Sequence, residues 1–320
     1  MIKKRRLGKT EIYVSEIGLG GFQLGEPTVI NNKPHTAFGG MDEKTALDII
    51  RKAIELGINT FDTADVYSLG NSEYRLGKAL KKYRSDVNIF TKAGSLVTNP
   101  DSYDISYHNL MASIDRSLNR LQTDYVDLFQ VHKPPETEKE FTDVKKAFKS
   151  IKSEGKARYC GISVGIRYEQ GIEIIKRKLV DSLQIYFSLI DQKPLKELIP
   201  LAKKNNVGVI VAEPLAQGLL TNKYKIGHTF PKNDLRSNGY SKQLLEKKLK
   251  RVKQFNFLIK KNRTLNQAAL AYVLSKEEVS TCIPGAKSTE QLISNVTSSK
   301  IKLNQPELKK IEEIQVEWGD

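Results

Sequence analysis

Short apolar runs alternate with amphipathic segments along almost the whole 320-residue chain. The runs are rich in β-branched residues, and the segments between them repeat apolar residues every three or four positions. This alternation predicts parallel βαβ units. Eight runs are predicted to be strands: Glu16–Leu19, Ile58–Asp62, Asn88–Thr91, Tyr125–Gln130, Tyr159–Ile162, Ser182–Ile185, Gly208–Ala212 and Thr281–Pro284.

The helical periodicity predicts helices between these strands. They include Glu43–Leu56, His108–Leu121, Glu138–Lys152, Ile172–Lys178, Leu195–Asn205 and Thr289–Val296, with two more, Ser241–Lys261 and Thr264–Leu274, in one connection. Eight strand–helix repeats favour a closed (β/α)8 TIM barrel over an open sheet. No GxGxxG motif follows an early strand, which argues against a Rossmann fold. No low-complexity linker occurs, so residues 1–320 are predicted to form one domain.

Three segments lie outside the repeat. Residues 5–14 alternate around Gly8-Lys9-Thr10 and predict an N-terminal β-hairpin that plugs one end of the barrel. Residues 23–42 and 215–240 form two long connections. Loops of this length in a compact domain usually carry function or are disordered, so substrate specificity is expected to reside there.

Charge and composition exclude several classes of protein. The net charge of +15 comes from Lys-rich faces of predicted helices, and no basic–aromatic motif or zinc finger accompanies it, so no nucleic-acid partner is expected. No apolar run approaches the ~20 residues of a membrane span, and no secretory signal follows Met1. We therefore expect a cytoplasmic protein. Cys160 and Cys282 form no CxxC pair, which predicts buried thiols and no metal site.

Four polar side chains fall at or just after three consecutive predicted strands. Asp62 ends the second strand, Tyr67 follows in the same loop, Lys92 ends the third strand and His132 follows the fourth. Active residues of a TIM barrel lie at the C-terminal ends of its strands, so the four are expected to meet. Individually, each has a structural explanation: a helix cap, a loop-packing aromatic, an ion pair or a hydrogen-bonded histidine.

The chemistry of the four groups is coherent. A free tyrosine has a pKa near ~10, and a nearby ammonium lowers that pKa. Lys92 is therefore predicted to tune Tyr67, while Asp62 keeps Lys92 charged and His132 binds the substrate oxygen. Tyr67 would then deliver a proton to an oxygen as hydride reaches its carbon.

Ordered motifs extend this pattern over nearly the whole chain. They are Gly18–Gly21, Phe61–Tyr67 with Gly70–Glu73, Thr91-Lys92, Leu118–Leu128, His132, Gly161–Ser163, Gln184, Pro214-Leu215 with Gly218–Leu220, and Ile283–Lys287. Their order and spacing resemble the aldo-keto reductase superfamily. The resemblance implies a catalytic tetrad of Asp62, Tyr67, Lys92 and His132. Residues 231–238, PKNDLRSN, are similar to the bacterial branch that includes inositol-operon reductases.

The same resemblance implies a path for a nicotinamide cofactor. The nicotinamide end would contact Gly21, Phe22, Asp62, Ser163 and Gln184. The pyrophosphate and adenosine end would contact Pro214, Leu215, Gln217, Gly218, Gly285, Ala286, Lys287, Gln291 and Asn295. The start of the last predicted barrel helix suits a phosphate because helix N-termini present free N–H groups; an ordinary capped helix is the alternative for this stretch.

Three positions depart from the family pattern. Val164 stands where an asparagine usually helps to hold the carboxamide, Ala212 where an aromatic usually stacks on the nicotinamide, and Gln291 where many relatives have an arginine. Lys287 is then the obvious cation for the 2′-phosphate, which predicts NADP(H), with NAD(H) as the alternative. Lysine discriminates less sharply than a bidentate arginine.

The sequence therefore predicts a reductase of aldehydes or ketones acting on a small-molecule carbonyl or alcohol substrate. A nucleotide-binding regulatory subunit with little turnover, like the potassium-channel β-subunits that resemble this family, is one alternative. A Schiff-base aldolase using Lys92 is another, which Asp62 disfavours because it keeps the amine protonated. A sugar, a sugar derivative or a small aldehyde all remain open as substrate, and the oligomeric state and direction of reaction are not predicted.

Overall fold

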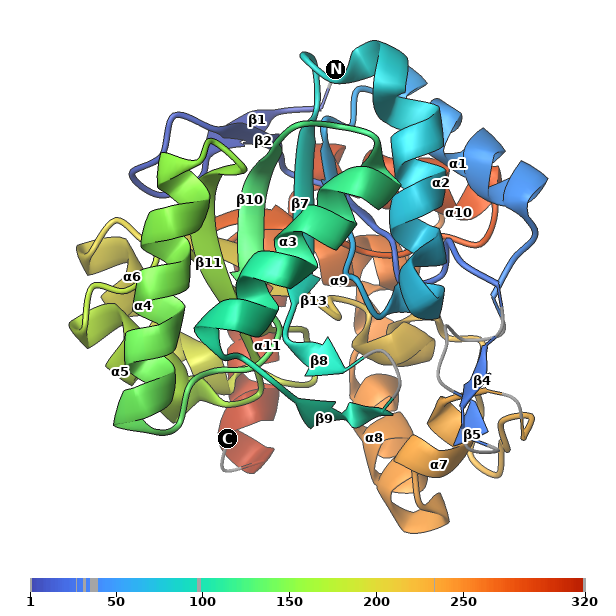
Figure 1. Ribbon diagram of the computed structural model, residues 1–320. Coiled ribbons are helices and arrows are strands. Elements are labelled where there is room, and N and C mark those ends of the chain that lie inside the picture. Colours follow the sequence, from blue (N-terminus) through green and yellow to red (C-terminus); the bar gives the residue numbers. More distant parts are fainter. Residues whose placement is uncertain are drawn as a thin grey trace.

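Eight parallel strands curl into one barrel (Figure 1). The computed structural model describes residues 2–26, 28–30, 33–34, 40–96, 99–232 and 234–318. The strand order is β14-β13-β12-β11-β10-β7-β6-β3. The strands are β3 (Leu19–Gly20), β6 (Thr60–Asp62), β7 (Asn88–Ala93), β10 (Val126–Val131), β11 (Ala157–Gly165), β12 (Ser182–Tyr186), β13 (Gly208–Ala212) and β14 (Val279–Cys282).

The two outermost strands of this order meet and close the barrel. The Cys282 amide donates to Glu16 O at 3.0 Å, and the Gly18 amide donates to Cys282 O at 2.8 Å. Pairing between the first strand and the last is parallel, with Ile17 opposite Cys282. The predicted TIM barrel is confirmed, although the first strand begins at Leu19, three residues after the start of its predicted run, because Ile17 forms only an isolated bridge.

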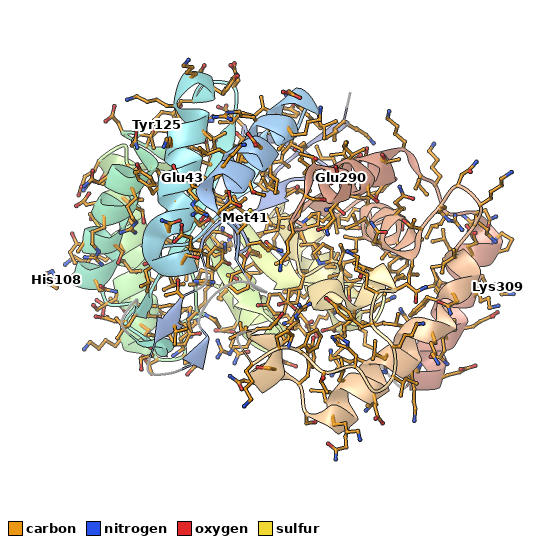
Figure 2. All side chains as sticks on the ribbon, turned by 90° about the vertical axis from the view of Figure 1, so that its right-hand side faces the viewer. Met41, Glu43, His108, Tyr125, Glu290 and Lys309 are labelled. Atoms are coloured by element: carbon orange, nitrogen blue, oxygen red, sulfur yellow. The ribbon has the colours of Figure 1, made fainter. Side chains whose placement is uncertain are left out.

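Helices surround the barrel (Figure 1). They are α1 (Glu43–Glu55), α2 (Asn71–Leu80), α3 (Tyr107–Leu121), α4 (Glu138–Ser153), α5 (Tyr168–Lys176), α6 (Leu198–Lys204), α7 (Arg236–Gly239), α8 (Lys242–Gln254), α9 (Leu265–Leu274), α10 (Thr289–Thr297) and α11 (Gln305–Trp318). Side-chain caps mark several starts: Asp42 accepts the Thr45 amide, and Thr137 forms a capping box with Glu140. In Figure 2, Glu43 and Glu290 mark the first turns of α1 and α10, which pack together.

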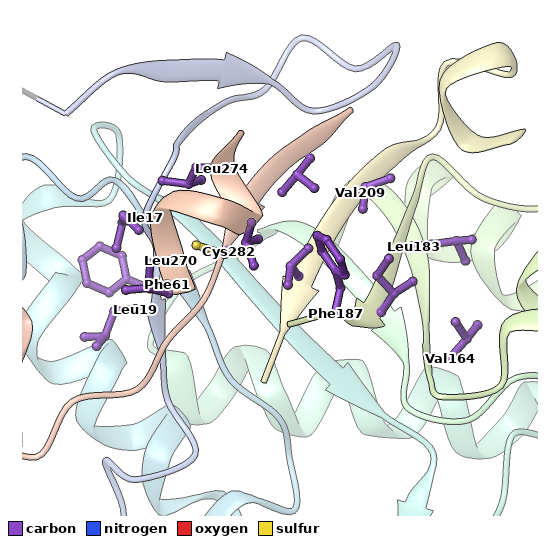
Figure 3. Packing of buried hydrophobic residues seen from close by; sticks show 14 of the residues in the cluster. Ile17, Leu19, Phe61, Val164, Leu183, Phe187, Val209, Leu270, Leu274 and Cys282 are labelled. Carbon is purple, nitrogen blue, oxygen red and sulfur yellow. The ribbon is translucent and has the colours of Figure 1, made fainter. Parts of the chain in front are cut away.

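The main core lies between the outer face of the strands and the helices. Figure 3 shows part of it, where Phe61 of β6 and Leu270 of α9 belong to the same buried cluster. Cys160 and Cys282 are both fully buried in this layer, and burial raises the pKa of both thiols. They are small core residues, as the sequence predicts.

The N-terminal hairpin covers the end of the barrel opposite the loops β8–β9 and α7–α8 (Figure 1). It pairs β1 (Lys4–Arg6) with β2 (Tyr13–Ser15). Its apolar residues Leu7, Ile12 and Val14 form a second cluster with inward-facing residues of the barrel strands, Phe90, Leu128, Ile210 and Ile283. The predicted plug is confirmed, because this cluster packs the hairpin against the interior of the barrel.

Three helices were not predicted: α2, α11 and the short α7. Helix α2 hides its periodicity because it buries Glu73 and Arg75 and carries Gly77 in its interior. That glycine is a packing requirement, since an added Cβ would collide with the Leu121 backbone at the end of α3. Amphipathicity rules assume apolar residues on the buried face, and here charged residues and a glycine occupy it.

Other boundaries also differ from the prediction. Helix α8 ends at Gln254, short of residue 261, because the chain turns to bury Phe255 and Leu258 in the core. The connection 23–42 contains two short strands, β4 (Val29–Ile30) and β5 (Lys33–Pro34), and most of the rest of 27–39 lies outside the described residues. A further hairpin, β8 (Ser95–Leu96) with β9 (Asn99–Tyr103), follows β7 and was not predicted.

None of the described helices is both long and apolar enough to cross a membrane.

Candidate active site

The four predicted side chains converge at the C-terminal ends of three adjacent strands. Strand β6 pairs with β7, and β7 pairs with β10, so Asp62, Lys92 and His132 are placed side by side. Lys92 Nζ lies 2.5 Å from Asp62 Oδ1 and 4.9 Å from the centroid of the Tyr67 ring. The rings of Tyr67 and His132 are 5.7 Å apart between centroids. The barrel geometry thus brings together residues that are separated by up to 70 positions.

Lys92 and Asp62 form an ion pair inside the barrel. Lys92 is fully buried and Asp62 is 1% exposed. Burial lowers the pKa of Lys92, and the Asp62 carboxylate opposes that shift. Lys92 Nζ also donates to Thr63 O at 2.7 Å. The expected Asp62–Lys92 pairing is therefore present in the structure.

The second oxygen of Asp62 is held by two glutamine amides. Gln184 Nε2 donates to Oδ2 at 2.8 Å, and Gln130 Nε2 donates at 3.1 Å. Because an ionised carboxylate only accepts hydrogen bonds, both amide NH₂ groups must face it. The carbonyl oxygen of Gln184 is then turned the other way, toward the Ser163 hydroxyl at 3.5 Å.

Tyr67 and His132 are both neutral at physiological pH. Burial raises the pKa of Tyr67 well above its ordinary value, and the Asp62 and Glu213 carboxylates push it in the same direction. Burial and the Lys92 charge lower the pKa of His132 to about 3. The sequence-based expectation of a lowered Tyr67 pKa is not met in this structure, because desolvation of the phenol and the nearby carboxylates raise that pKa. A phenol that keeps its proton can still donate it.

The loop after Tyr67 has an unusual backbone. Ser68, Leu69 and Gly70 all have positive φ, at 51°, 56° and 86°. Left-handed backbone is unfavourable for residues with a Cβ, so the surrounding contacts must hold this turn. Ser68 Oγ donates to Glu26 O at 2.9 Å. This contact ties the Tyr67 loop to the segment after β3.

A buried charged cluster lies behind the Tyr67 loop. Asp65 and Glu73 are 3% and 0% exposed. Glu73 accepts from Thr91 Oγ1 at 2.5 Å and from Arg120 Nε at 2.6 Å, whereas Asp65 Oδ1 has no hydrogen-bond partner among the described residues. Burial, and then the Glu73 charge, raise the pKa of Asp65 to about 8. Asp65 therefore keeps a proton at neutral pH.

The predicted nicotinamide-side residues surround the same site. The Gly21 amide donates to Asp62 O at 2.7 Å, and the Phe22 ring meets the Tyr67 ring edge-on at 5.0 Å. Ala212 packs against the apolar cluster that the N-terminal hairpin forms with Phe90, Leu128, Ile210 and Ile283. Val164 differs from the expectation: it is buried in the outer core, near Gly171 of α5, and so does not line the cleft (Figure 3).

The segment after β13 makes a tight, strained turn. Glu213, Ala216 and Gln217 have positive φ, and Gly218 follows with φ 89°. Gln217 Nε2 donates to Glu213 Oε1 at 2.9 Å. Arg236, from α7, donates to Gln217 O at 2.8 Å and pairs with Asp234 at 2.6 Å. The long connection 215–240 thus folds back on itself; Pro214 and Leu215 begin it.

Helix α10 starts where the cofactor phosphate was predicted. Ser288 caps it and accepts from the Gln291 amide at 3.3 Å. Gln291 Oε1 accepts the Lys287 amide at 2.9 Å, and Asn295 Nδ2 donates to Gly285 O at 3.3 Å. Both side chains bend back to brace the turn of Gly285, Ala286 and Lys287. Partial burial of its ammonium, with the charges of Arg236 and Lys223, lowers the pKa of Lys287.

The residues present fit a nicotinamide dinucleotide. An added Cβ at Gly285 would collide with the Gln23 amide, and Gln23 Oε1 is buried without a partner among the described residues. Gln184 offers an acceptor and Ser163 a hydroxyl at the Tyr67 end, while α10 presents its N-terminus at the other end. A primary carboxamide and a phosphate are the groups that these donors and acceptors would bind.

The family model of the aldo/keto reductase family matches residues 16–316. The chain belongs to the aldo/keto reductase family. The reductase AKR11C1 from Bacillus halodurans in its holo form superimposes with a TM-score of 0.80 and 32% identity, over 98% of this chain and 96% of that one. A putative voltage-gated potassium channel subunit β from Schizosaccharomyces pombe is 33% identical, over 97% and 92% of the two chains. An NADH-specific methylglyoxal reductase from Escherichia coli is 29% identical, over 95% of each.

This aldo/keto reductase is accordingly an NAD(P)H-dependent oxidoreductase of carbonyl groups. Sequence reasoning missed four residues around its site: Gln130, Asp65, Glu73 and Arg236. Gln130 had a signal, since it is a polar residue inside the apolar run of β10. Asp65, Glu73 and Arg236 lay within motifs that match the family, but nothing in the sequence showed that the packing buries their charged side chains.

Proposed function

We propose that this reductase prefers NADP(H) and reduces an aldehyde or ketone to an alcohol, with Tyr67 as the proton donor. The observation that carries the proposal is the convergence of Tyr67, His132 and the buried Lys92–Asp62 pair at one end of the barrel. The bound nicotinamide supplies the hydride. Tyr67 holds the proton on Oη, and its high pKa ensures that it is protonated before reaction.

Each neighbour of Tyr67 has a separate task in this proposal. His132 is neutral, so it can hydrogen-bond a carbonyl oxygen and orient it toward the phenol. Lys92 lies near the ring and stabilises the negative charge that develops on Tyr67 as the proton leaves. Asp62 keeps Lys92 charged inside the barrel. Phe22 packs edge-on against Tyr67 and limits water around it.

We assign the cofactor contacts to the residues already described. Ser163 and Gln184 would hold the carboxamide beside Gly21 and Phe22. Pro214, Leu215, Gln217 and Gly218 would cover the pyrophosphate, and Gly285, Ala286 and Lys287 would hold the adenosine phosphate at the start of α10. Gln291 and Asn295 support this turn through their hydrogen bonds to it.

The preference for NADP(H) rests on Lys287. Arg236 and Lys223 lower its pKa and Asp234 opposes them, so three cations and one carboxylate gather near the start of α10 and leave it positively charged. A 2′-phosphate dianion would be attracted there, whereas a 2′-hydroxyl would gain little. The NADH-specific relative shows that the family includes both preferences, so the choice must be measured.

The substrate is proposed only by class: a sugar, a sugar derivative or a small aldehyde. A panel of such carbonyls, followed by the loss of NADPH absorbance, would test it. Tyr67→Phe should abolish the turnover that the wild type shows. A turnover rate that Tyr67→Phe leaves unchanged would refute Tyr67 as the acid.

The resemblance to a potassium channel β-subunit favours a second candidate, a nucleotide-binding regulatory subunit with little turnover. The intact constellation around Tyr67 supports the enzyme instead. Tight NADPH binding with no oxidation across the panel would favour the subunit. The single domain over residues 1–320, the cytoplasmic location, the inositol-operon branch and the lack of a nucleic-acid partner stay predictions.

A further inference from the structure

Gln130 is a buried polar residue that the tetrad chemistry does not use. It is 0% exposed inside the barrel, on β10, opposite Lys92 of β7 and Gly161 of β11 in the strand registers. Its Nε2 donates to Asp62 Oδ2, but its Oε1 has no hydrogen-bond partner among the described residues. A buried polar atom without a partner destabilises the fold. An unbranched apolar residue of similar length would avoid that cost, so stability alone does not explain a glutamine here.

The contacts of Gln130 suggest its role. Asp62 accepts from Lys92 on one oxygen and from Gln130 and Gln184 on the other. A carboxylate and an ammonium in a dry interior are at risk of neutralising each other by proton transfer, because burial disfavours both charges. Hydrogen bonds donated to the carboxylate favour its ionised form. The side-chain amides of Gln130 and Gln184 therefore keep the Lys92–Asp62 pair ionised.

We propose that Gln130 is a positioning residue that, together with Gln184, clamps Asp62 as a carboxylate so that Lys92 remains an ammonium beside Tyr67. This inference rests on the proposed function. Gln184 also faces the proposed carboxamide site, so its amide has two tasks. Among the described residues, Asp62 is the one member of the tetrad and of the proposed cofactor residues that Gln130 hydrogen-bonds, so its effect must pass through Asp62.

The titratable groups around the clamp, charged and neutral, fix the expected direction. Lys92 faces Asp62 from β7, and Tyr67 faces it from the following loop. Asp65 and Glu73, from the loop and α2, act on Lys92. Glu213, after β13, and His132, after β10, complete the set around Tyr67 and Lys92. Lys92 is the only cation of this set, so loss of a donor to Asp62 favours protonated Asp62.

The experiment compares Gln130→Met and Gln130→Glu with the wild type. Gln130→Met keeps the length of the side chain and removes the donor. We expect kcat to fall about tenfold, the effect of losing one hydrogen bond to a charged group. The acid limb of the kcat–pH profile should move up by about one pH unit. Gln130→Glu places a second carboxyl beside Asp62, so the two should share a proton and the limb should move further.

A matched control uses another buried glutamine. Gln192 is 6% exposed, accepts from Tyr272 and donates to Leu189 O, away from the tetrad. Gln192→Met should lower Tm and leave the pH profile unchanged. Gln130→Met removes a hydrogen bond to a buried carboxylate together with an unsatisfied oxygen, so its Tm should hold or fall, and it should change the profile. The change in the pH profile, which Gln192→Met should not show, separates positioning from packing.

A second readout does not depend on activity. Tm is measured against pH without cofactor for each variant. Because the clamp is lost in Gln130→Glu, the decrease of Tm at acidic pH should occur at a higher pH in this variant than in the wild type. If the wild type is active and both Gln130 variants have the same kcat, kcat–pH profile and Tm–pH curve as the wild type, the clamp is overturned. Inactive wild type with shifted Tm curves would overturn the proposed function and leave the clamp standing.

Discussion

Asp65→Asn should stabilise this protein increasingly as the pH rises. Asp65 is 3% exposed, and one of its carboxylate oxygens lacks a partner among the described residues. Burial and the nearby Glu73 carboxylate raise its pKa from the ordinary 3.8 to about 8. Asparagine resembles the protonated side chain in size and cannot ionise. The substitution therefore removes the titration and keeps the shape.

The sign follows from proton linkage. Between about pH 4 and about pH 8, the folded protein keeps a proton on Asp65 that the unfolded chain has released. Unfolding then releases a proton, so the free energy of unfolding falls as the pH rises. This loss of unfolding free energy is absent below the pKa of Asp65 in the unfolded chain and complete above its pKa in the folded protein. Asp65→Asn should show no gain near pH 4 and its full gain above about pH 8.

The size of the gain follows from the pKa. Each pKa unit corresponds to ~1.4 kcal/mol, so the whole interval has a ceiling of about 5 to 6 kcal/mol. Relaxation and water entry around Asp65 and Glu73 reduce such ceilings in proteins. We expect about 2 to 3 kcal/mol above pH 8, which is a large fraction of the stability of a typical domain.

Denaturant unfolding from about pH 4 to about pH 9 measures this gain. The difference between variant and wild type is plotted against pH, so other titrating groups cancel. Asp86→Asn is the matched control, since Asp86 is exposed and should give a flat difference. A flat difference for Asp65→Asn as well would show that Asp65 ionises normally in the folded protein and would refute the reasoning.

The remaining predictions concern the acid, the cofactor and the strained turn. Tyr67→Phe should lower kcat for carbonyl reduction by ~10²–10⁴, the usual effect of general acid–base catalysis, with little change in the NADPH Kd by fluorescence titration; unchanged kcat contradicts it. Lys92→Met should be similarly damaging and non-additive with Tyr67→Phe, because both act on one proton transfer; additive losses would contradict the shared step. Lys287→Met should weaken NADPH binding about 10- to 100-fold, from ~1.5–3 kcal/mol of charge-assisted contact, and barely change NADH binding; equal losses would exclude 2′-phosphate recognition. Leu69→Asn should raise the free energy of unfolding by ~0.5–1 kcal/mol, since Leu69 is 47% exposed with φ 56° and a left-handed conformation costs leucine ~1–2 kcal/mol; a lower Tm would show that its side chain packs favourably.

The sequence alone determined the barrel and its reacting end. Apolar runs such as Asn88–Thr91 need burial on both faces, which forces parallel strands covered by helices, and so the order of elements follows from local patterning. Asp62, Lys92 and His132 fall at the ends of such runs, so their convergence also follows from strand periodicity.

Only the tertiary structure decided the environments of these groups. Burial depends on contacts between distant segments, so the sequence could not show that desolvation raises the pKa of Tyr67. The period of a strand already places Val164 on the face opposite to Ser163, but only the tertiary structure shows that this face packs near Gly171 of α5. The sequence shows a glutamine at position 130, but the contact of Gln130 with Asp62 exists only once the barrel closes around both residues.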